Sequence, residues 1–434
     1  MIRTQIIPCK LNKETCDNLN LASGRIYSGI VSRHWRLLKQ KGLWLKEKSL
    51  TRFSDMRLAN KDLPMHAHSI DAAQQGFFKA CVTTRALRKA GFPEANFPWR
   101  SKKFRTTTWK NTAIKFVNGT IRLSNGNGND RIEIAFPDQN ILKVLEVRLV
   151  FEKKSRRYEW HIVCENGKQP RVTTGSNTVS VDPGEIHPAV VGDEHESTII
   201  TCRKRRHQMQ GHAKRLAKLS QKLSSKKNGS RQHRRLVRAK SRMKAKHERV
   251  MRDMEHKISR EIVNVAVGSE ANMIVYGDIK DIGDGVALGK QTNQKISGWN
   301  HGKVRAYVEY KAEAEGIAVV MQDERHTSQT CPSCAGAPWA RHKPRGRHYR
   351  CPSCGFQSHR DVVGQVNILS AFKFGAPGKI PAPTIIKHRI PYNIRVMRRR
   401  ADTPQMLDAS VACGFKPQEA LGLKLRGVSQ GLQE

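Results

Sequence analysis

The alternation of apolar and polar residues divides the chain into a β-rich part and a later α/β part. Residues 1–11 alternate in the manner of one strand, and a helical region with mixed apolar spacing follows over roughly 15–90. Short apolar runs separated by Gly- and Asn-rich turns then predict several strands between about 104 and 166. This pattern predicts a small antiparallel barrel that is split by a helical insert.

The α/β part contains apolar strands that end directly before acidic residues. The strands and the residues that follow them are 178–181 before Asp182, 271–276 before Gly277 and Asp278, and 317–321 before Asp323 and Glu324. An amphipathic helix over 302–315 precedes the last of these strands, and the run 197–201 is placed to form a hairpin beside the first. The acids are therefore expected near the ends of neighbouring strands.

Residues 203–267 form a long helical region that is strongly basic. Between 203 and 260 there are 22 Lys or Arg residues against three acids, and Asn228-Gly229-Ser230 marks a break between two helices. The whole chain carries 79 basic and 37 acidic residues, a formal charge of +42. Such charge in a helical pair repels itself unless phosphates neutralise it, which favours a nucleic-acid partner. A membrane is not expected, because there is no long apolar run and the start is too polar for a signal peptide.

Four of the ten cysteines form two Cys-x-x-Cys pairs, Cys331 with Cys334 and Cys351 with Cys354. Each tight turn aims two sulfurs inward, and four thiolates suit tetrahedral zinc. A Cys₄ set leaves no open position, so the ion is expected to be structural. The other six cysteines stand singly, as is typical of a reducing cytosol.

Carboxylates flank this predicted zinc ribbon, with Glu324 before it and Asp361 after it. Acids at the ends of successive strands and at a helix start are what a two-metal phosphoryl-transfer site requires. Hard Mg²⁺ ions need oxygen ligands, and about three carboxylates can hold two ions roughly 4 Å apart. The ribbon is thus expected to be an insert in one catalytic α/β domain.

These motifs together resemble the TnpB family of transposon-encoded RNA-guided DNA nucleases, which are relatives of the type V CRISPR effectors. The resemblance covers roughly 178–370 and is carried by Val-Asp182-Pro-Gly, Thr327-Ser-Gln-Thr-Cys-Pro-x-Cys, the second cysteine pair, and His359-Arg-Asp361-x-x-Gly-x-x-Asn367-Ile. It implies a mixed α/β and β fold: a RuvC-like RNase H fold with an inserted Cys₄ zinc ribbon, preceded by a wedge-type β-barrel that carries a helical recognition insert. The corresponding domains are the first wedge strand 1–14, the helical recognition domain 15–99, the rest of the wedge barrel 100–168, the nuclease 169–330 with its basic insert 203–260, the zinc ribbon 331–355, the last nuclease helix 356–375 and a flexible basic tail 376–434.

The resemblance also implies an activity: RNA-guided cleavage of DNA beside a short recognition motif, with two Mg²⁺ ions and one structural Zn²⁺. The implied partners are a guide RNA from the element's own end and double-stranded target DNA, in the cytoplasm of a prokaryote near its nucleoid. A guided DNA-binding protein without cleavage, acting as a repressor, and a guide-independent zinc-ribbon protein are the alternatives. The sequence leaves the guide, the target motif and the oligomeric state open.

The second catalytic acid departs from the family pattern. Asp182 and Asp361 take the positions of the first and last catalytic Asp, but Gly277 stands where most relatives carry Glu. Glu324 could substitute from the neighbouring strand, Asp278 could serve although an adjacent strand residue points to the other face, or the site could be inactive. We favour Glu324, because both flanking Asp residues are present.

Overall fold

The structure is a computed structural model that describes residues 2–47, 57–60, 62–126, 128–136, 141–167, 169–279, 289–334, 342, 346–392 and 394. The chain divides into two units, which are described in turn. Unit 1 comprises Met1–Val172, His212–Arg252 and Glu313–Gly316, and unit 2 comprises Thr173–Gly211, Asp253–Ala312 and Ile317–Glu434.

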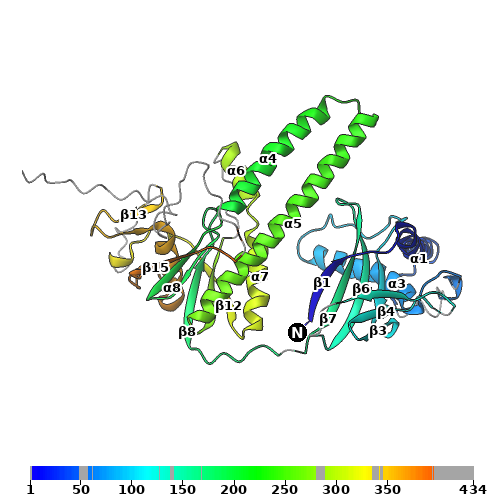
Figure 1. Ribbon diagram of the computed structural model, residues 1–434, viewed down its shortest axis with the longest axis horizontal. Coiled ribbons are helices and arrows are strands. Elements are labelled where there is room, and N and C mark those ends of the chain that lie inside the picture. The colour runs from blue at the N-terminus through cyan, green and yellow to red at the C-terminus, as the bar shows by residue number, and fades with distance from the viewer. Residues whose placement is uncertain are drawn as a thin grey trace, which may run out of the picture. The chain divides into compact units, whose positions relative to one another are not determined.

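Unit 1 contains two antiparallel sheets that share one apolar core (Figure 1). The first sheet has the order β1 (Ile2–Pro8), β7 (Arg157–Glu165), β6 (Lys143–Glu152) and β2 (Thr107–Lys110), and the second has the order β3 (Ile114–Val117), β4 (Thr120–Leu123) and β5 (Ile132–Ala135). Their inward side chains, among them Trp109, Ile121 and Leu149, are buried in the shared core. Alternating burial along β4 and β5 is the period-2 pattern that predicts such strands.

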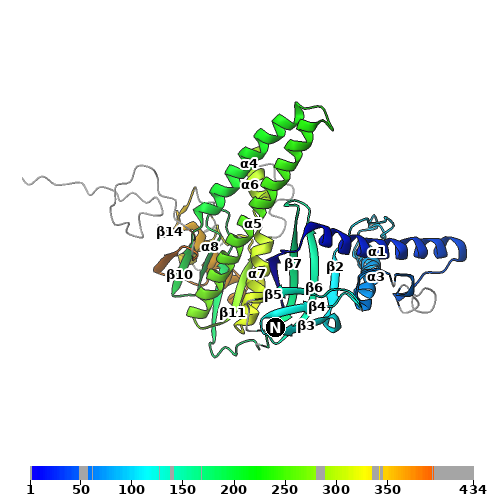
Figure 2. The same cartoon turned by 45° about the vertical axis from the view of Figure 1, so that its right-hand side comes forward.

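Two helices lie between β1 and β2 in the sequence. They are α1 (Lys13–Lys41) and α3 (Ala67–Lys89). The short 3₁₀ helix η2 (Leu58–Asn60) lies between them, and η3 (Asn111–Ala113) follows β2. Asn12 caps α1 by accepting a hydrogen bond from Thr15 N at 2.7 Å, and the helix ends at Gly42, whose φ is 64°. The helices pack on one another and against β2, around buried residues such as Tyr27 and Phe77 (Figure 2).

A long helical hairpin follows, formed by α4 (Arg203–Ser224) and α5 (Arg231–Gly268) (Figure 1). In its outer part the rings of His212 and His247 stack 3.8 Å apart, and Lys240 donates to Ser220 Oγ at 3.1 Å. Basic side chains lie along both helices, and the buried apolar residues in the second half of α5 include Met251, Met254, Ile258 and Ile262. Among the described residues, none of the helices is long and apolar enough to cross a membrane.

Unit 2 is built on a six-stranded mixed sheet. Its order is β12 (Ala318–Asp323), β11 (Ala271–Asp278), β8 (Asn177–Asp182), β9 (Ala189–Gly192), β10 (Glu196–Ile200) and β15 (Ile385–Arg389). Strand β9 is antiparallel to both of its neighbours, β8 and β10, whereas β11 and β12 run parallel to β8 and β15 runs parallel to β10. The carboxyl ends of β8, β11 and β12 therefore meet at one edge of the sheet.

The helix α8 (Arg360–Phe374) packs across this sheet and is fixed by buried polar contacts. Gln365 Nε2 donates to Ser180 Oγ at 2.7 Å and to the carbonyl of Gly192 at 3.0 Å, while Ser197 Oγ donates to Gln365 Oε1. The helices α6 (Lys290–Ser297) and α7 (His301–Ala314) precede β12. The ribbon between β12 and α8 contains η4 (Pro332–Cys334), β13 (His348–Arg350) and β14 (Gln357–His359).

The observed fold confirms a mixed α/β architecture. The flexible tail was predicted to begin at 376, and this is wrong for its first part, because β15 is hydrogen-bonded to β10 and Ile380 is buried against α8. Pairing with the buried strand β10 orders this part of the segment. The rest of the predicted tail, 393 and 395–434, lies outside the described residues, as do 335–341 and 343–345 of the ribbon.

Candidate active site and metal centre

Asp182 is the last residue of β8, at the edge where the three parallel strands end. The strand register pairs Val181 with Tyr276, which places Asp182 level with Gly277. Burial raises the pKa of Asp182 well above its usual value, and the nearby carboxylates of Glu324 and Asp361 raise it further. Because a buried carboxylate in this position is stabilised by a proton or a cation, Asp182 suits a metal site.

Asp361 lies in the first turn of α8, where the helix N-terminus favours a negative charge. His359 caps the helix, since its Nδ1 accepts a hydrogen bond from Asp361 N at 3.2 Å. One turn further along, a Cβ at Gly364 would lie 2.4 Å from Asp182 Oδ2. Glycine at this position lets α8 approach the end of β8, which brings Asp361 and Asp182 close enough for their charges to interact.

Glu324 follows β12 and places its side chain over the adjacent strand β11. A Cβ built on Gly277 would lie 1.8 Å from Glu324 Oε1 and 2.7 Å from its Cδ, so this carboxyl occupies the space of a side chain at position 277. Burial raises the pKa of Glu324 to about 8, with Asp278 and Asp323 contributing. Its Oε1 is buried and has no hydrogen-bond partner within the described part of the chain. The Glu324 carboxyl therefore fills the space that the absent side chain of Gly277 leaves open.

Asp278 lies close to the Glu324 carboxyl, but its side chain is expected to point to the other face of the sheet. It follows Gly277 on β11, and alternate residues of a strand point to opposite faces. Its carboxylate is 4.0 Å from Nη1 of Arg305 in α7, and its side chain is 20% exposed. Asp278 thus has a cationic neighbour of its own, whereas Glu324 packs on the Gly277 backbone.

Arg347 connects the ribbon to the start of α8. Its Nη1 donates to both carboxylate oxygens of Asp361, at 2.9 Å and 2.6 Å. The Asp361 side chain is 15% exposed, so solvent screens this ion pair less than it would a fully exposed one. The ion pair places a guanidinium, which can bind phosphate oxygens, beside the carboxylates.

The structure brings Asp182, Glu324 and Asp361 together from a strand end, the residue after a strand and a helix start. Three carboxylates, two of which (Asp182 and Glu324) have a raised pKa, fit hard divalent cations such as Mg²⁺. An orphaned buried oxygen on Glu324 is consistent with the same fit. Such a cluster can activate water and stabilise charge at a phosphodiester.

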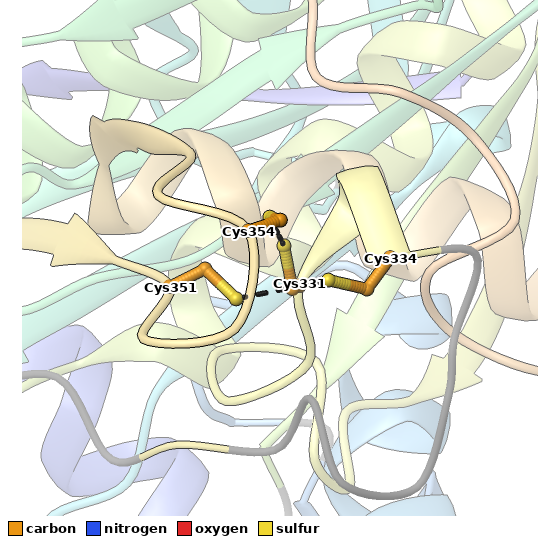
Figure 3. Close-up of side chains that lie close together, drawn as sticks. All are labelled: Cys331, Cys334, Cys351 and Cys354. Carbon is orange, nitrogen blue, oxygen red and sulfur yellow. Dashed lines mark hydrogen bonds between the residues drawn. The ribbon is translucent and has the colours of Figure 1, made fainter.

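The four ribbon cysteines converge on one point (Figure 3). The Sγ atoms of Cys331 and Cys354 are 3.7 Å apart, as are those of Cys334 and Cys351. Tetrahedral zinc with Zn–S bonds of about 2.3 Å requires sulfurs separated by about 3.8 Å, whereas a disulfide requires about 2 Å. Backbone N–H groups after each first cysteine, such as those of Ser333 and Ser353, point at its sulfur and stabilise a thiolate. The donor set therefore fits a structural Zn²⁺ ion.

Two residues that position the site were not identified from the sequence as structural supports. Gln365 links α8 to three strands, and Asn367 Nδ2 donates to the carbonyls of Thr327 and Thr330 at 2.7 Å and 2.8 Å. Asn367 thereby holds the loop that leads from Glu324 to the ribbon. The sequence signal for both supports is that Gln365 and Asn367 interrupt the otherwise apolar stretch 362–369. A buried amide in a helix needs hydrogen-bond partners elsewhere.

Models of two protein families match separate segments of the chain. A family described as "Cas12f1-like, TNB domain" matches residues 301–368, and a family described as "Probable transposase" (OrfB of the IS605 type) matches residues 161–282. Over these segments the chain is therefore similar to transposon-encoded and CRISPR-associated proteins. The relationship to the TnpB family inferred from the motifs is thereby confirmed.

Individual relatives agree with this. A TnpB-like protein of Methanocaldococcus jannaschii is 26% identical over 142 residues, which cover 32% of this chain and 49% of the relative. A CRISPR-associated endodeoxyribonuclease Cas12f1 of Sulfoacidibacillus thermotolerans is 28% identical over 113 residues, covering 26% of this chain and 25% of the relative. The chain thus spans half or less of these curated relatives. The solved Cas12f1 in a complex with sgRNA and target DNA has a TM-score of 0.58 at 12% identity, covering 82% of this chain and 83% of that one, which shows a shared fold.

Proposed function

We propose that this chain is an RNA-guided DNA endonuclease that hydrolyses phosphodiester bonds with two divalent metal ions. The observation that carries the proposal is the carboxylate group of Asp182, Glu324 and Asp361, and above all the Glu324 carboxyl that fills the space over Gly277. A decayed site would not need a second strand to replace the missing acid. The group lies in the segment that matches TnpB and Cas12f1 families, which supports the same chemistry.

The strand arrangement of unit 2 supports a RuvC-like RNase H fold for the nuclease. Three antiparallel strands, β8 to β10, are followed in sequence by two that run parallel to β8 on its other side. The ribbon would be an insert of this domain, and the sheets and helices of unit 1 would be the wedge barrel and its recognition insert. The domain boundaries given above remain our proposal.

Each acidic residue has a defined part in the proposed reaction. Bound divalent ions would lower the pKa of a water and stabilise the leaving oxygen. Asp182, Glu324 and Asp361 would hold these ions through their carboxylate oxygens. Arg347 would exchange its ion pair with Asp361 for a contact to the substrate phosphate, since its Nη1 can donate to phosphate oxygens as it does to the carboxylate.

The basic hairpin supports a guide RNA and a DNA target as partners. Its many Lys and Arg side chains extend along α4 and α5 with few acids to neutralise them, so phosphates would relieve their repulsion. Reading of the target by base pairing would leave the protein to recognise backbone and shape. Binding of structured RNA should therefore weaken steeply as salt rises.

Copurification and cleavage together test the proposal. RNA of discrete length should copurify with the full-length protein, and sequencing it gives a matched DNA target. The complex should then cut this target in Mg²⁺ or Mn²⁺ and leave a target without guide complementarity intact. Tight binding of the matched target without cutting in either ion would favour the repressor alternative, and the absence of discrete RNA would favour a guide-independent nucleic-acid-binding protein.

A further inference from the structure

Two histidines lie next to the proposed centre, and the proposed reaction gives neither of them a part. Ligand atoms of His187, His359 and Asp361 all lie within 4.8 Å of one another. His187 comes from the turn after β8 and His359 from the residue that caps α8, and their ring centroids are 5.4 Å apart. All three side chains are partly buried. Two imidazoles and one carboxylate, from separate elements, form a compact three-ligand set.

The contacts of the two rings leave one nitrogen of each for a ligand. His187 Nδ1 lies 3.2 Å from Thr201 Oγ1, and donation to this hydroxyl would fix the ring with Nε2 as the ligand atom. His359 Nδ1 instead accepts from Asp361 N. Ligation through Nε2 places the single ring proton on Nδ1. When His359 binds the metal in this way, its Nδ1 no longer accepts the hydrogen bond from Asp361 N that caps α8.

We propose that His187, His359 and Asp361 bind one first-row divalent transition-metal ion, for which Mn²⁺ serves as the paramagnetic probe. Imidazole favours borderline ions, whereas Mg²⁺ prefers oxygen ligands, so the nitrogen ligands give this position a preference that an all-carboxylate site lacks. Arg347 also contacts Asp361, but a carboxylate has enough lone pairs for a guanidinium and a metal at once. The inference rests on the proposed function in one respect: Asp361 is shared with the proposed nuclease centre, whose metal selectivity the histidines would set.

The test measures metal binding by the full-length, zinc-loaded protein without nucleic acid. Mn²⁺ is titrated and followed by electron paramagnetic resonance, and electron spin-echo modulation detects nitrogen ligands of the bound ion. The variants are His187→Ala and His359→Asn, of which the second keeps an oxygen acceptor for the α8 cap. His348→Gln is the control, because His348 is an exposed imidazole on the same ribbon. Zinc content and thermal unfolding of each variant check that it is folded.

The protein should bind Mn²⁺ with nitrogen modulation and prefer it to Mg²⁺ by at least tenfold. His187→Ala and His359→Asn should each weaken Mn²⁺ binding by roughly ten- to hundredfold and remove the signal of one nitrogen ligand, and His348→Gln should change neither. Bound Mn²⁺ without nitrogen modulation, or unchanged affinity in the folded His359→Asn variant, would overturn the proposal. Because the readout needs no cleavage, Mn²⁺ bound through nitrogen in a protein that never cuts DNA would uphold this site and refute only the nuclease.

Discussion

The zinc ribbon and the carboxylate centre are both sets of metal ligands, yet the chain builds them in different ways. The four ribbon cysteines lie within 24 residues of one another, in two local turns whose backbone amides point at the sulfurs. The three carboxylates span 182 to 361, and their approach depends on strand register and on the two glycines Gly277 and Gly364. The ribbon cysteines are positioned by local turns, whereas the carboxylates are positioned by the packing of the surrounding sheet and α8.

This difference predicts opposite consequences of mutation. The sheet and α8 are held by Gln365, Asn367 and an apolar core, so they do not need the acids for folding. The apolar core around the ribbon cysteines is small: Tyr349 comes from the ribbon and Val363 from α8, so the ribbon depends on its metal. Loss of a carboxylate should abolish catalysis and leave the fold intact. Loss of a cysteine should first unfold the ribbon.

Removing one ribbon cysteine should have the largest effect. We expect Cys331→Ser to lose stoichiometric zinc and to destabilise the ribbon by several kcal/mol, because its cross-link is gone. Metal analysis and limited proteolysis between 331 and 355 measure this. Cys81→Ser, a buried cysteine outside the ribbon, is the control and should keep zinc. Full zinc occupancy in Cys331→Ser would contradict the Cys₄ site.

Removing one carboxylate should abolish cleavage without unfolding the protein. Asp182→Asn and Asp361→Asn should each slow cutting by roughly 10³-fold or more, because several kcal/mol of metal-borne stabilisation is lost. Guide binding, target binding and zinc content should stay near those of the unmutated protein. Cleavage rates and filter-binding assays on the same preparations provide the comparison, and an active Asp182→Asn would refute the proposed centre.

The raised pKa of Glu324 predicts a pH-dependent stability of the metal-free protein. Its pKa is about 8 in the folded state against an ordinary value of 4.5, so between these pH values the unfolded chain releases a proton that the folded protein keeps. The free energy of unfolding should therefore fall as pH rises from about 4.5 to 8, by roughly 2–4 kcal/mol from this residue. Urea unfolding of Glu324→Gln should lack this part of the slope. If the free energy of unfolding depends on pH in the same way in both proteins, Glu324 does not have this raised pKa.

A smaller effect is expected from filling the space between α8 and β8. Gly364→Ala places a methyl group 2.4 Å from Asp182 Oδ2, so α8 must shift, with a loss of roughly 1–3 kcal/mol and slower cleavage. Gly302→Ala in α7 is the matched control, since its Cβ would meet nothing within 4 Å. Calorimetry and cleavage rates compare the two, and equal behaviour would mean that the close approach is not needed.

The sequence predicts the local features of this protein better than the distant ones. The Cys-x-x-Cys spacing identified the ribbon ligands because both members of each pair lie in one turn. The strand ends at Asp182 and Glu324 were predictable from apolar runs that stop at an acid. The local patterns do not tell which strands are neighbours. The packing of Glu324 on Gly277 likewise depends on the register of β11 with β12, which no local pattern contains. The same holds for His187 and His359, which are far apart in sequence, and for β15, which is ordered by its partner strand.

The central claim is that Glu324 replaces the acid missing at Gly277, and one comparison of cleavage rates tests it most directly. The proteins are Glu324→Ala, Asp278→Ala and the double variant Gly277→Glu/Glu324→Ala, each with the same guide and with target binding measured in parallel. We predict that Glu324→Ala binds but does not cut, that Asp278→Ala cuts, and that the double variant regains at least tenfold of the lost rate, because the carboxyl returns to the same space from β11. An active Glu324→Ala together with an inactive Asp278→Ala would contradict the claim.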